Sequence, residues 1–126
     1  MAQPVTTSIE TGTPRTVYGN VRNTGSIENL PEDACVEVPC LVDRAGVQPT
    51  SVGSIPPGPA TLNRLYVNVC ELTVRAVLEG SRTLVYQAAL MDPATGAALT
   101  TDEIVDVCDE LIEAHAEHLP EAIVRG

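Results

Sequence analysis

The chain has 126 residues, the length of one domain, and its 44% hydrophobic and 19% charged residues indicate a globular protein rather than a disordered one. Seven arginines and no lysine stand against 17 acidic residues, and no two arginines are adjacent, so binding to nucleic acid or to an anionic membrane is disfavoured. No apolar run approaches the roughly 20 residues of a membrane helix, and the N-terminus lacks the features of a secretion signal, so we expect a cytoplasmic protein.

The first half of the chain is predicted to be rich in β-structure. Residues 1–15, rich in Thr and containing two prolines, are expected to form an extended arm, and residues 16–21 alternate weakly, as a short strand does. Residues 34–42 alternate clearly and predict the main strand, with Pro39 favouring an edge or a bulge. A turn at Gly46 leads back into a partner strand over 47–52, so an antiparallel hairpin is expected.

The second half is predicted to be helical. A proline-rich connector over 55–59 ends the β-rich half of residues 16–59, and a helical period begins at Ala60 and stops at Gly80. Ser81 is placed to cap a second helix over 82–91. The sequence from Thr100 to Glu103 fits a capping box for a last helix that stops at Pro120. We therefore expect a single α+β domain over 1–126, with a helical half of about three helices over 60–126.

The cysteines and the last helix give no metal site by their spacing. Cys35, Cys40, Cys70 and Cys108 lie among apolar residues without the paired short spacings of zinc sites, and free thiols are expected. The acidic residues of the last predicted helix are expected to form a solvated face, which comprises Asp102, Glu103, Asp106, Asp109, Glu110, Glu113 and Glu117. His115 and His118 beside these acids lack the order of a helical zinc motif.

The loop over residues 22–33 is the candidate binding site. Arg22, Asn23, Gly25 and Asn29 lie on this irregular segment, and an arginine with two amides and a glycine can orient a polyhydroxyl or anionic ligand. The alternative, that the amides only order the turn, stays open at this point. No nucleophile elbow, dinucleotide fingerprint or P-loop occurs in the chain, so no catalytic residue is assigned from motifs.

The residues at 18–50, with their Asn-Leu-Pro and Val-Glu-Val-Pro runs, resemble family 4 glycoside hydrolases, above all alpha-galactosidases, alpha-glucosidases and alpha-galacturonidases. Further likenesses are at residues 68–74, 85–89 and 102–104, so the resemblance covers nearly all of residues 8–119. It is confined to the C-terminal portion of such enzymes. The fold that it implies is their C-terminal domain, which is similar to that of lactate and malate dehydrogenases.

The resemblance implies a reaction that the chain is not expected to perform alone. In the family, NAD takes a hydride from the sugar, and bound Mn²⁺ with a tyrosine base assists elimination of the glycosidic oxygen. The motifs for NAD and Mn²⁺ do not match any part of this chain, so no cofactor-binding or metal residue is assigned, and an inactive domain or fragment is expected. The loop with Arg22 and Asn23 would face the sugar.

Two other functions stay open beside this one. The chain is alternatively a non-catalytic oligomerisation or interaction module, or a sugar-binding domain that uses the Arg22 loop. The expected partner is a second copy of the chain, or a missing NAD domain on another polypeptide.

Overall fold

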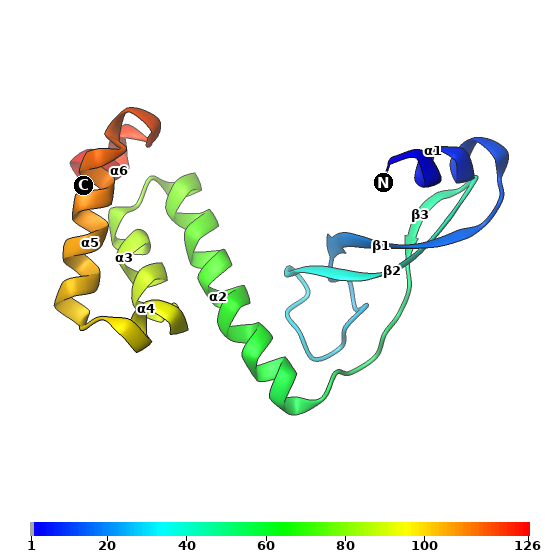
Figure 1. The fold of residues 1–126 in the computed structure, drawn as a ribbon, viewed down its shortest axis with the longest axis horizontal. Helices are drawn as coiled ribbons and strands as arrows, with labels where there is room; N and C mark the ends of the chain where they lie inside the picture. Colours follow the sequence, from blue (N-terminus) through cyan, green and yellow to red (C-terminus); the bar gives the residue numbers. More distant parts are fainter. Residues whose placement is uncertain (1) are drawn as a thin grey trace. The chain divides into compact units, whose positions relative to one another are not determined.

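The computed structural model describes residues 2–126, with side chains from Val5 onward. The chain divides into two compact units, here called unit 1 (residues up to Thr61) and unit 2 (Leu62–Gly126). Figure 1 shows the blue and cyan strands of unit 1 and the yellow to red helices of unit 2. Within residues 2–126, no helix is both long enough and apolar enough to cross a membrane.

Unit 1 is built on a three-stranded antiparallel sheet in the order β1 (Arg15–Arg22), β2 (Cys35–Asp43) and β3 (Gly46–Pro49). The register places Arg22 opposite Cys35 as the last residue pair of β1 and β2, next to the loop that joins the two strands. The alternation of the main strand is confirmed, since it buries one row of side chains: Val36, Val38, Cys40 and Val42.

The hairpin between β2 and β3 is confirmed, but its second strand is shorter than expected. Gly46 has a φ of 100°, and the Ala45 N–H donates to Asp43 Oδ1 at 2.8 Å. Strand β3 ends at Pro49 rather than at residue 52, because the chain then turns toward the loop, where the Val52 N–H donates to Ser26 O at 2.7 Å.

The predicted extended arm over 1–15 is wrong, because helix α1 spans Ala2–Thr11. This helix packs on β1 and β2, and its Ser8 is fully buried. The helix ends at Gly12, whose φ is 75° and whose N–H donates to Ser8 O at 2.9 Å. Packing against the sheet therefore outweighs the weak helix propensity of the threonines.

Helix α2 spans Pro57–Glu79 and begins three residues before the predicted start at Ala60, because proline is tolerated in a first helical turn. Its predicted stop is confirmed. Gly80 has a φ of 64°, and the Ser81 N–H donates to Ala76 O at 2.9 Å, the long hydrogen bond of a Schellman motif.

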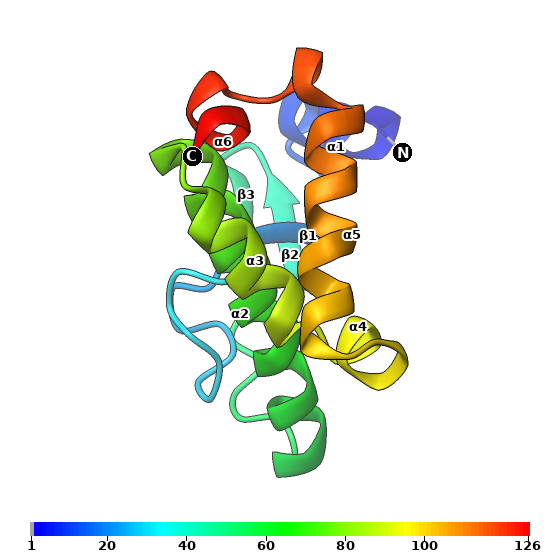
Figure 2. The same cartoon turned by 90° about the vertical axis from the view of Figure 1, so that its left-hand side faces the viewer.

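The remaining helices of unit 2 pack around a small apolar core. They are α3 (Arg82–Met91), α4 (Pro93–Ala98), α5 (Thr101–Ala114), the 3₁₀ turn η1 (Ala116–His118) and α6 (Glu121–Arg125). Figure 2 shows α3, α5 and α6 side by side. The α+β class is confirmed, with α2, α3 and α5 as the three longer helices after the sheet.

The last predicted helix is split into pieces. Its capping box is confirmed, since Thr100 Oγ1 accepts from the Glu103 N–H at 3.4 Å and Glu103 Oε2 accepts from the Thr100 N–H at 2.8 Å. Helix α5, however, ends at Ala114, before the predicted stop. Pro120 instead precedes α6, which buries Ile123.

Candidate functional site

The loop between β1 and β2 is closed at its base by backbone hydrogen bonds. The Asn23 N–H donates to Ala34 O at 2.8 Å, which continues the ladder one step beyond Arg22 and Cys35. From there the chain makes a compact turn instead of a hairpin. In a compact loop of this kind, side chains satisfy many of the backbone groups that a regular sheet would pair.

The side chain of Asn23 organises this loop. It is fully buried, and its Nδ2 donates to three carbonyl oxygens: Ile27 O at 2.9 Å, Leu30 O at 3.0 Å and Pro31 O at 3.0 Å. Its Oδ1 accepts from the Ile27 N–H at 2.9 Å. One side chain thus satisfies backbone groups that a strand would otherwise pair, and this is the ordering role that the sequence left open for the amides.

The half-buried Asn29 fixes the loop to the segment after β3. Its Nδ2 donates to Ile55 O at 2.7 Å, and its Oδ1 accepts from the Ile55 N–H at 3.0 Å. A parallel bridge between Ile27 and Gly53 adds a second attachment. The loop is therefore held along much of its length by the segment that follows β3, at Gly53 and Ile55.

The exposed part of the loop carries an ion pair. Arg22 Nη2 contacts Asp33 Oδ1, and the two side chains are 70% and 80% exposed. Gly25 has a φ of 90°, a backbone conformation that glycine adopts without strain. Of the four predicted binding residues, Arg22 and Gly25 thus lie at the surface, whereas Asn23 and Asn29 point inward. Asp33, which sequence reasoning did not select, lies beside Arg22.

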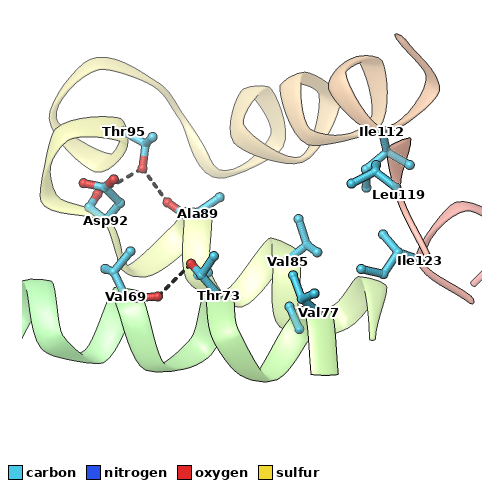
Figure 3. A pocket seen from close by; sticks show the side chains of 12 residues that line it. Val69, Thr73, Val77, Val85, Ala89, Asp92, Thr95, Ile112, Leu119 and Ile123 are labelled. Atoms are coloured by element: carbon cyan, nitrogen blue, oxygen red, sulfur yellow. Dashed lines mark hydrogen bonds between the residues drawn. The ribbon is translucent and has the colours of Figure 1, made fainter. Parts of the chain in front are cut away.

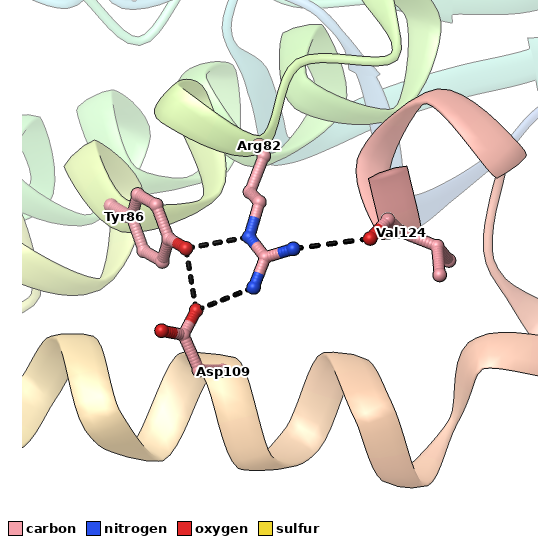
Figure 4. Close-up of polar contacts among 4 residues, drawn as sticks. All are labelled: Arg82, Tyr86, Asp109 and Val124. Carbon is pink, nitrogen blue, oxygen red and sulfur yellow. Dashed lines mark hydrogen bonds and ion pairs between the residues drawn. The ribbon is translucent and has the colours of Figure 1, made fainter. Parts of the chain in front are cut away.

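A second polar cluster lies in unit 2 and was not predicted (Figure 4). Arg82 donates from Nε to Tyr86 Oη at 2.6 Å, from Nη2 to Asp109 Oδ1 at 2.8 Å and from Nη1 to Val124 O at 3.1 Å. Tyr86 Oη also donates to Asp109 Oδ1 at 2.5 Å. The cluster ties α3 to α5 and to α6. The expectation that Asp109 belongs to a purely solvated face is therefore wrong.

The hydrogen bonds of this cluster shift two pKa values in opposite directions. Donation from Arg82, and then from Tyr86, lowers the pKa of the Asp109 carboxyl below its ordinary value. Donation to Asp109, with partial desolvation, raises the pKa of the Tyr86 hydroxyl. The folded state thus favours the charged carboxylate and the neutral phenol.

These shifts predict that unit 2 loses stability at both extremes of pH. The contribution of Asp109 is present above the pKa of its unfolded form and is lost as the pH falls through the folded value. The contribution of Tyr86 is present below the pKa of its unfolded form and is lost as the pH rises through the folded value. Urea unfolding of the chain, followed by circular dichroism at a series of pH values, measures both losses of stability: the acid limb at low pH and the alkaline limb at high pH.

Two substitutions separate the limbs. Asp109→Asn is expected to flatten the acid limb, and Tyr86→Phe the alkaline limb. Asp106→Asn, on the exposed face of the same helix, is the matched control and is expected to leave both limbs unchanged. An acid limb in Asp109→Asn equal to that of the unsubstituted chain would contradict the assignment.

Unit 2 also contains an apolar cavity of about 380 Å³ between α2, α3 and the C-terminal helices (Figure 3). Its wall includes Val69, Val85 and Ile123, with Asp92 and Thr95 at the rim nearest α4. Both rim residues are engaged locally, since Thr95 Oγ1 donates to Asp92 O at 3.0 Å and Asp92 Oδ1 accepts from the Ala94 N–H. This lining offers apolar contact, and it brings no acid and base together.

Neither cluster has the composition of a metal centre. Among the described residues, no group of three or more His, Cys, Asp or Glu side chains is placed to hold a metal ion. Cys35 and Cys70 are exposed free thiols, and Cys40 and Cys108 are buried ones. The loop around Asn23, with Arg22 and Asp33 on its surface, is thus the best candidate for contact with a polar ligand.

Comparison with known proteins gives a consistent result. The family model described as "Family 4 glycosyl hydrolase C-terminal domain" matches residues 2–95. The chain is 44% identical over 114 residues to an alpha-galactosidase of Bacillus subtilis (strain 168), which covers 90% of this chain and 26% of that protein. It is 36% identical over 120 residues to an alpha-galactosidase of Rhizobium meliloti (strain 1021), which covers 95% of this chain and 24% of that protein.

Solved structures show the same relationship. The 6-phospho-beta glucosidase from Thermotoga maritima, solved with manganese, NAD+ and glucose-6-phosphate, matches with a TM-score of 0.82 at 30% identity. A 6-phospho-alpha-glucosidase from gut microorganisms, in complex with NAD and glucose-6-phosphate, matches with a TM-score of 0.82 at 31% identity. These matches cover 94% and 93% of this chain, but 30% and 26% of those chains. The chain spans about a quarter of the length of the curated relatives it matches.

Proposed function

Because the chain belongs to family 4 of the glycosyl hydrolases and corresponds to their C-terminal domain, we propose that it serves in the hydrolysis of α-glycosidic bonds and is inactive alone. The observation that carries this proposal is its 44% identity to an alpha-galactosidase over 90% of this chain but only 26% of that enzyme. A domain of this extent supplies part of an active site, and the rest of the enzyme supplies the remainder.

The described residues of this chain form no cluster suited to the metal ion that a relative's structure holds. The Thermotoga maritima structure holds manganese and NAD+. Here no group of three or more described His, Cys, Asp or Glu side chains is placed to hold a metal ion. Cys40 on β2 is a buried free thiol. We therefore propose that NAD and Mn²⁺ are bound by another part of the enzyme, either on the same polypeptide or on a partner.

The contribution of this chain is the loop with Arg22. A guanidinium presents several N–H donors in one plane, which suits the hydroxyl groups or an acidic group of a sugar. Asp33, its exposed partner, accepts hydrogen bonds and can therefore hold a second hydroxyl. Asn23 and Asn29 support this surface from beneath by fixing the backbone. Gly25 lets the chain turn between them.

The exposed free thiols are relevant to the cellular compartment of the protein. The side chains of Cys35 and Cys70 are exposed and unbridged, as thiols are in a reducing compartment. We therefore propose a cytoplasmic location.

The proposal is tested first with the pure chain. With NAD+, Mn²⁺ and a thiol present, it is expected not to hydrolyse a nitrophenyl α-galactoside, because the groups that move a hydride and bind the metal lie elsewhere. Release of nitrophenol by the chain alone would contradict the expected inactivity.

A chimera then tests the role of the loop. This chain replaces the segment that it matches in the Bacillus subtilis alpha-galactosidase, 26% of that protein, and the chimera is expected to hydrolyse the same substrate. Arg22→Ala in the chimera is expected to raise KM about tenfold through loss of hydrogen bonds from a charged donor. Arg15→Ala, at the opposite end of β1, is the matched control. Equal KM values for the two variants would remove Arg22 from the sugar site.

A further inference from the structure

The apolar cavity of unit 2 takes no part in the function proposed above. It has a volume of about 380 Å³ and lies between α2 and the helices that follow it (Figure 3). Its wall consists mainly of small aliphatic side chains, among them Val69, Ala76, Val85, Ala88 and Ala89. Pockets that hold small molecules in proteins have volumes of about 300–1,000 Å³ and a mostly apolar lining. The size and the lining of this cavity are therefore those of a ligand site.

The composition of the chain explains why this space is open. The sequence contains no Phe and no Trp, and none of its three tyrosines is among the described residues that line the cavity. Alanine and valine side chains of α2 and α3 therefore face one another here without an aromatic ring between them. Protein interiors have few voids larger than a water molecule, because every atom that faces a void loses contacts. A molecule that brings a ring into the cavity restores those contacts.

The polar side chains of the wall are already bonded within the chain. Thr73 Oγ1 donates to Val69 O at 2.8 Å. Thr95 Oγ1 donates to Asp92 O at 3.0 Å, and Asp92 Oδ1 accepts from the Ala94 N–H at 2.8 Å. Among the described residues that line the cavity, Asp92 alone carries a charge, which is negative in a chain whose net charge is −10. This wall therefore disfavours an anion, and it also disfavours a polyhydroxyl molecule, whose hydroxyl groups would lose water without gaining partners.

The cavity is open to solvent on the side of α2. Val77 lines it and is 54% exposed, and Thr73, four residues earlier on the same helix, is also exposed. Ala88 and Ile112, which line it from α3 and α5, are buried. A small molecule can thus enter past α2 without unfolding the unit, and it leaves water for an apolar environment when it does so.

We propose that this cavity binds a neutral molecule that carries an aromatic hydrocarbon ring. The ring replaces the aromatic side chain that the sequence does not provide, and it contacts Val69 on α2 and Ala89 on α3. Apolar cavities in proteins bind molecules of the size of benzene without any polar contact. The site lies wholly in unit 2 and includes no residue of the loop at Arg22, so it is separate from the sugar contact proposed above.

Toluene and benzoate form the test pair, because a carboxylate in benzoate takes the place of the methyl group in toluene. Thermal unfolding of the pure chain is followed by circular dichroism with each compound at the same millimolar concentration. Toluene is expected to raise the unfolding midpoint by at least about 4 °C, because a ligand that binds only the folded state stabilises it. Benzoate is expected to leave the midpoint unchanged, because its charge would lose water in the cavity.

NMR spectra of the unsubstituted chain locate the bound ring directly. Nuclear Overhauser effects are expected between the ring protons of toluene and the methyl groups of Val69, Val85 and Ala89. The methyl groups of Val74 and Leu78, which lie on α2 outside the cavity, are expected to show none.

Two substitutions test whether the cavity itself is the site. Ala89→Phe places a ring inside the cavity, toward which Ala89 points in Figure 3, and is expected to abolish the effect of toluene on the midpoint. Ala97→Phe adds the same ring at an exposed position of α4 outside the lining and is expected to keep the full effect. Circular dichroism shows whether each variant is folded. If Ala89→Phe is not folded, the NMR contacts of the unsubstituted chain still decide the question.

Four results would overturn the inference. Equal midpoint shifts with toluene and benzoate mean that the site does not select a neutral ring. A toluene effect that is equal in Ala89→Phe and Ala97→Phe places toluene elsewhere. An effect that disappears as the chain concentration rises assigns the cavity to a second copy of the chain. No effect and no NMR contact at any concentration assign it to side chains from the remainder of a longer enzyme. None of these measurements involves glycoside hydrolysis, so the ligand site stands or fails independently of the proposed function.

Discussion

Replacing Asn23 by alanine is expected to lower the free energy of unfolding of unit 1 by about 3 kcal/mol, because it leaves several buried backbone groups without partners. The carbonyl oxygens of Ile27, Leu30 and Pro31 lose their donor, and the Ile27 N–H loses its acceptor. Urea unfolding measures the total loss of free energy of unfolding. Faster hydrogen exchange of the amides in β1 and β2 shows that unit 1 is the part destabilised.

Two further variants sharpen this test. Asn20→Ala, at an exposed position of β1, is the matched control and is expected to change stability little. Asn23→Asp keeps the size of the side chain but places a carboxylate against three carbonyl oxygens, so it is expected to be worse than alanine at neutral pH. Its deficit relative to the unsubstituted chain should shrink as the pH falls, because the protonated carboxyl can donate. An Asn23→Ala variant as stable as the unsubstituted chain would refute the ordering role.

Replacing Gly80 by alanine is expected to destabilise unit 2 by about 2 kcal/mol, since a side chain at a positive φ is strained. Gly80 has a φ of 64°, and an added Cβ would lie 2.8 Å from the Cβ of Ala122 in α6. The change therefore strains the end of α2 and also pushes against the C-terminal helix. Thermal unfolding followed by circular dichroism measures the loss.

Gly96→Ala is the matched control for this prediction. Gly96 lies within α4 at a negative φ, and an added Cβ there meets no atom within 4 Å. Alanine is a better helix former than glycine, so this variant is expected to gain up to about 1 kcal/mol. A loss in Gly96→Ala as large as in Gly80→Ala would show that backbone strain is not the cause.

Local patterns predicted the elements whose signals are local. The alternation around Val38 gave β2, and the Thr100–Glu103 capping box gave the start of α5. Gly80 marked the end of α2 correctly, because the left-handed conformation that it adopts is a property of one residue. In these cases a few neighbouring residues determine the structure.

Elements that depend on distant contacts were missed. Helix α1 contains several threonines and a proline. Its packing on the sheet buries Ser8, but no periodic pattern in the sequence of the helix predicts this packing. Residues after Pro49 were expected to continue a strand, but they pair with the loop more than 20 residues earlier. Tertiary packing decides both outcomes, and a single sequence does not display it.

The candidate site was predicted in part for the same reason. The loop and its amides were selected, but only the structure shows that Asn23 faces inward and that Asp33 joins Arg22 at the surface. In unit 2, Arg82 and Tyr86 are four residues apart on α3, so their proximity could have been read from the helical period. Their shared partner Asp109 lies 27 residues after Arg82, on another helix, and no spacing rule connects them.

The anchoring of the loop by Asn23 has a consequence for redesign. Since one inward amide holds the backbone, the outward positions contribute little to holding the fold together. Those positions are Arg22, Thr24, Glu28, Glu32 and Asp33. A library that varies these five while keeping Asn23 should yield mostly folded members, so it can be screened for the sugar contact that we propose for this loop.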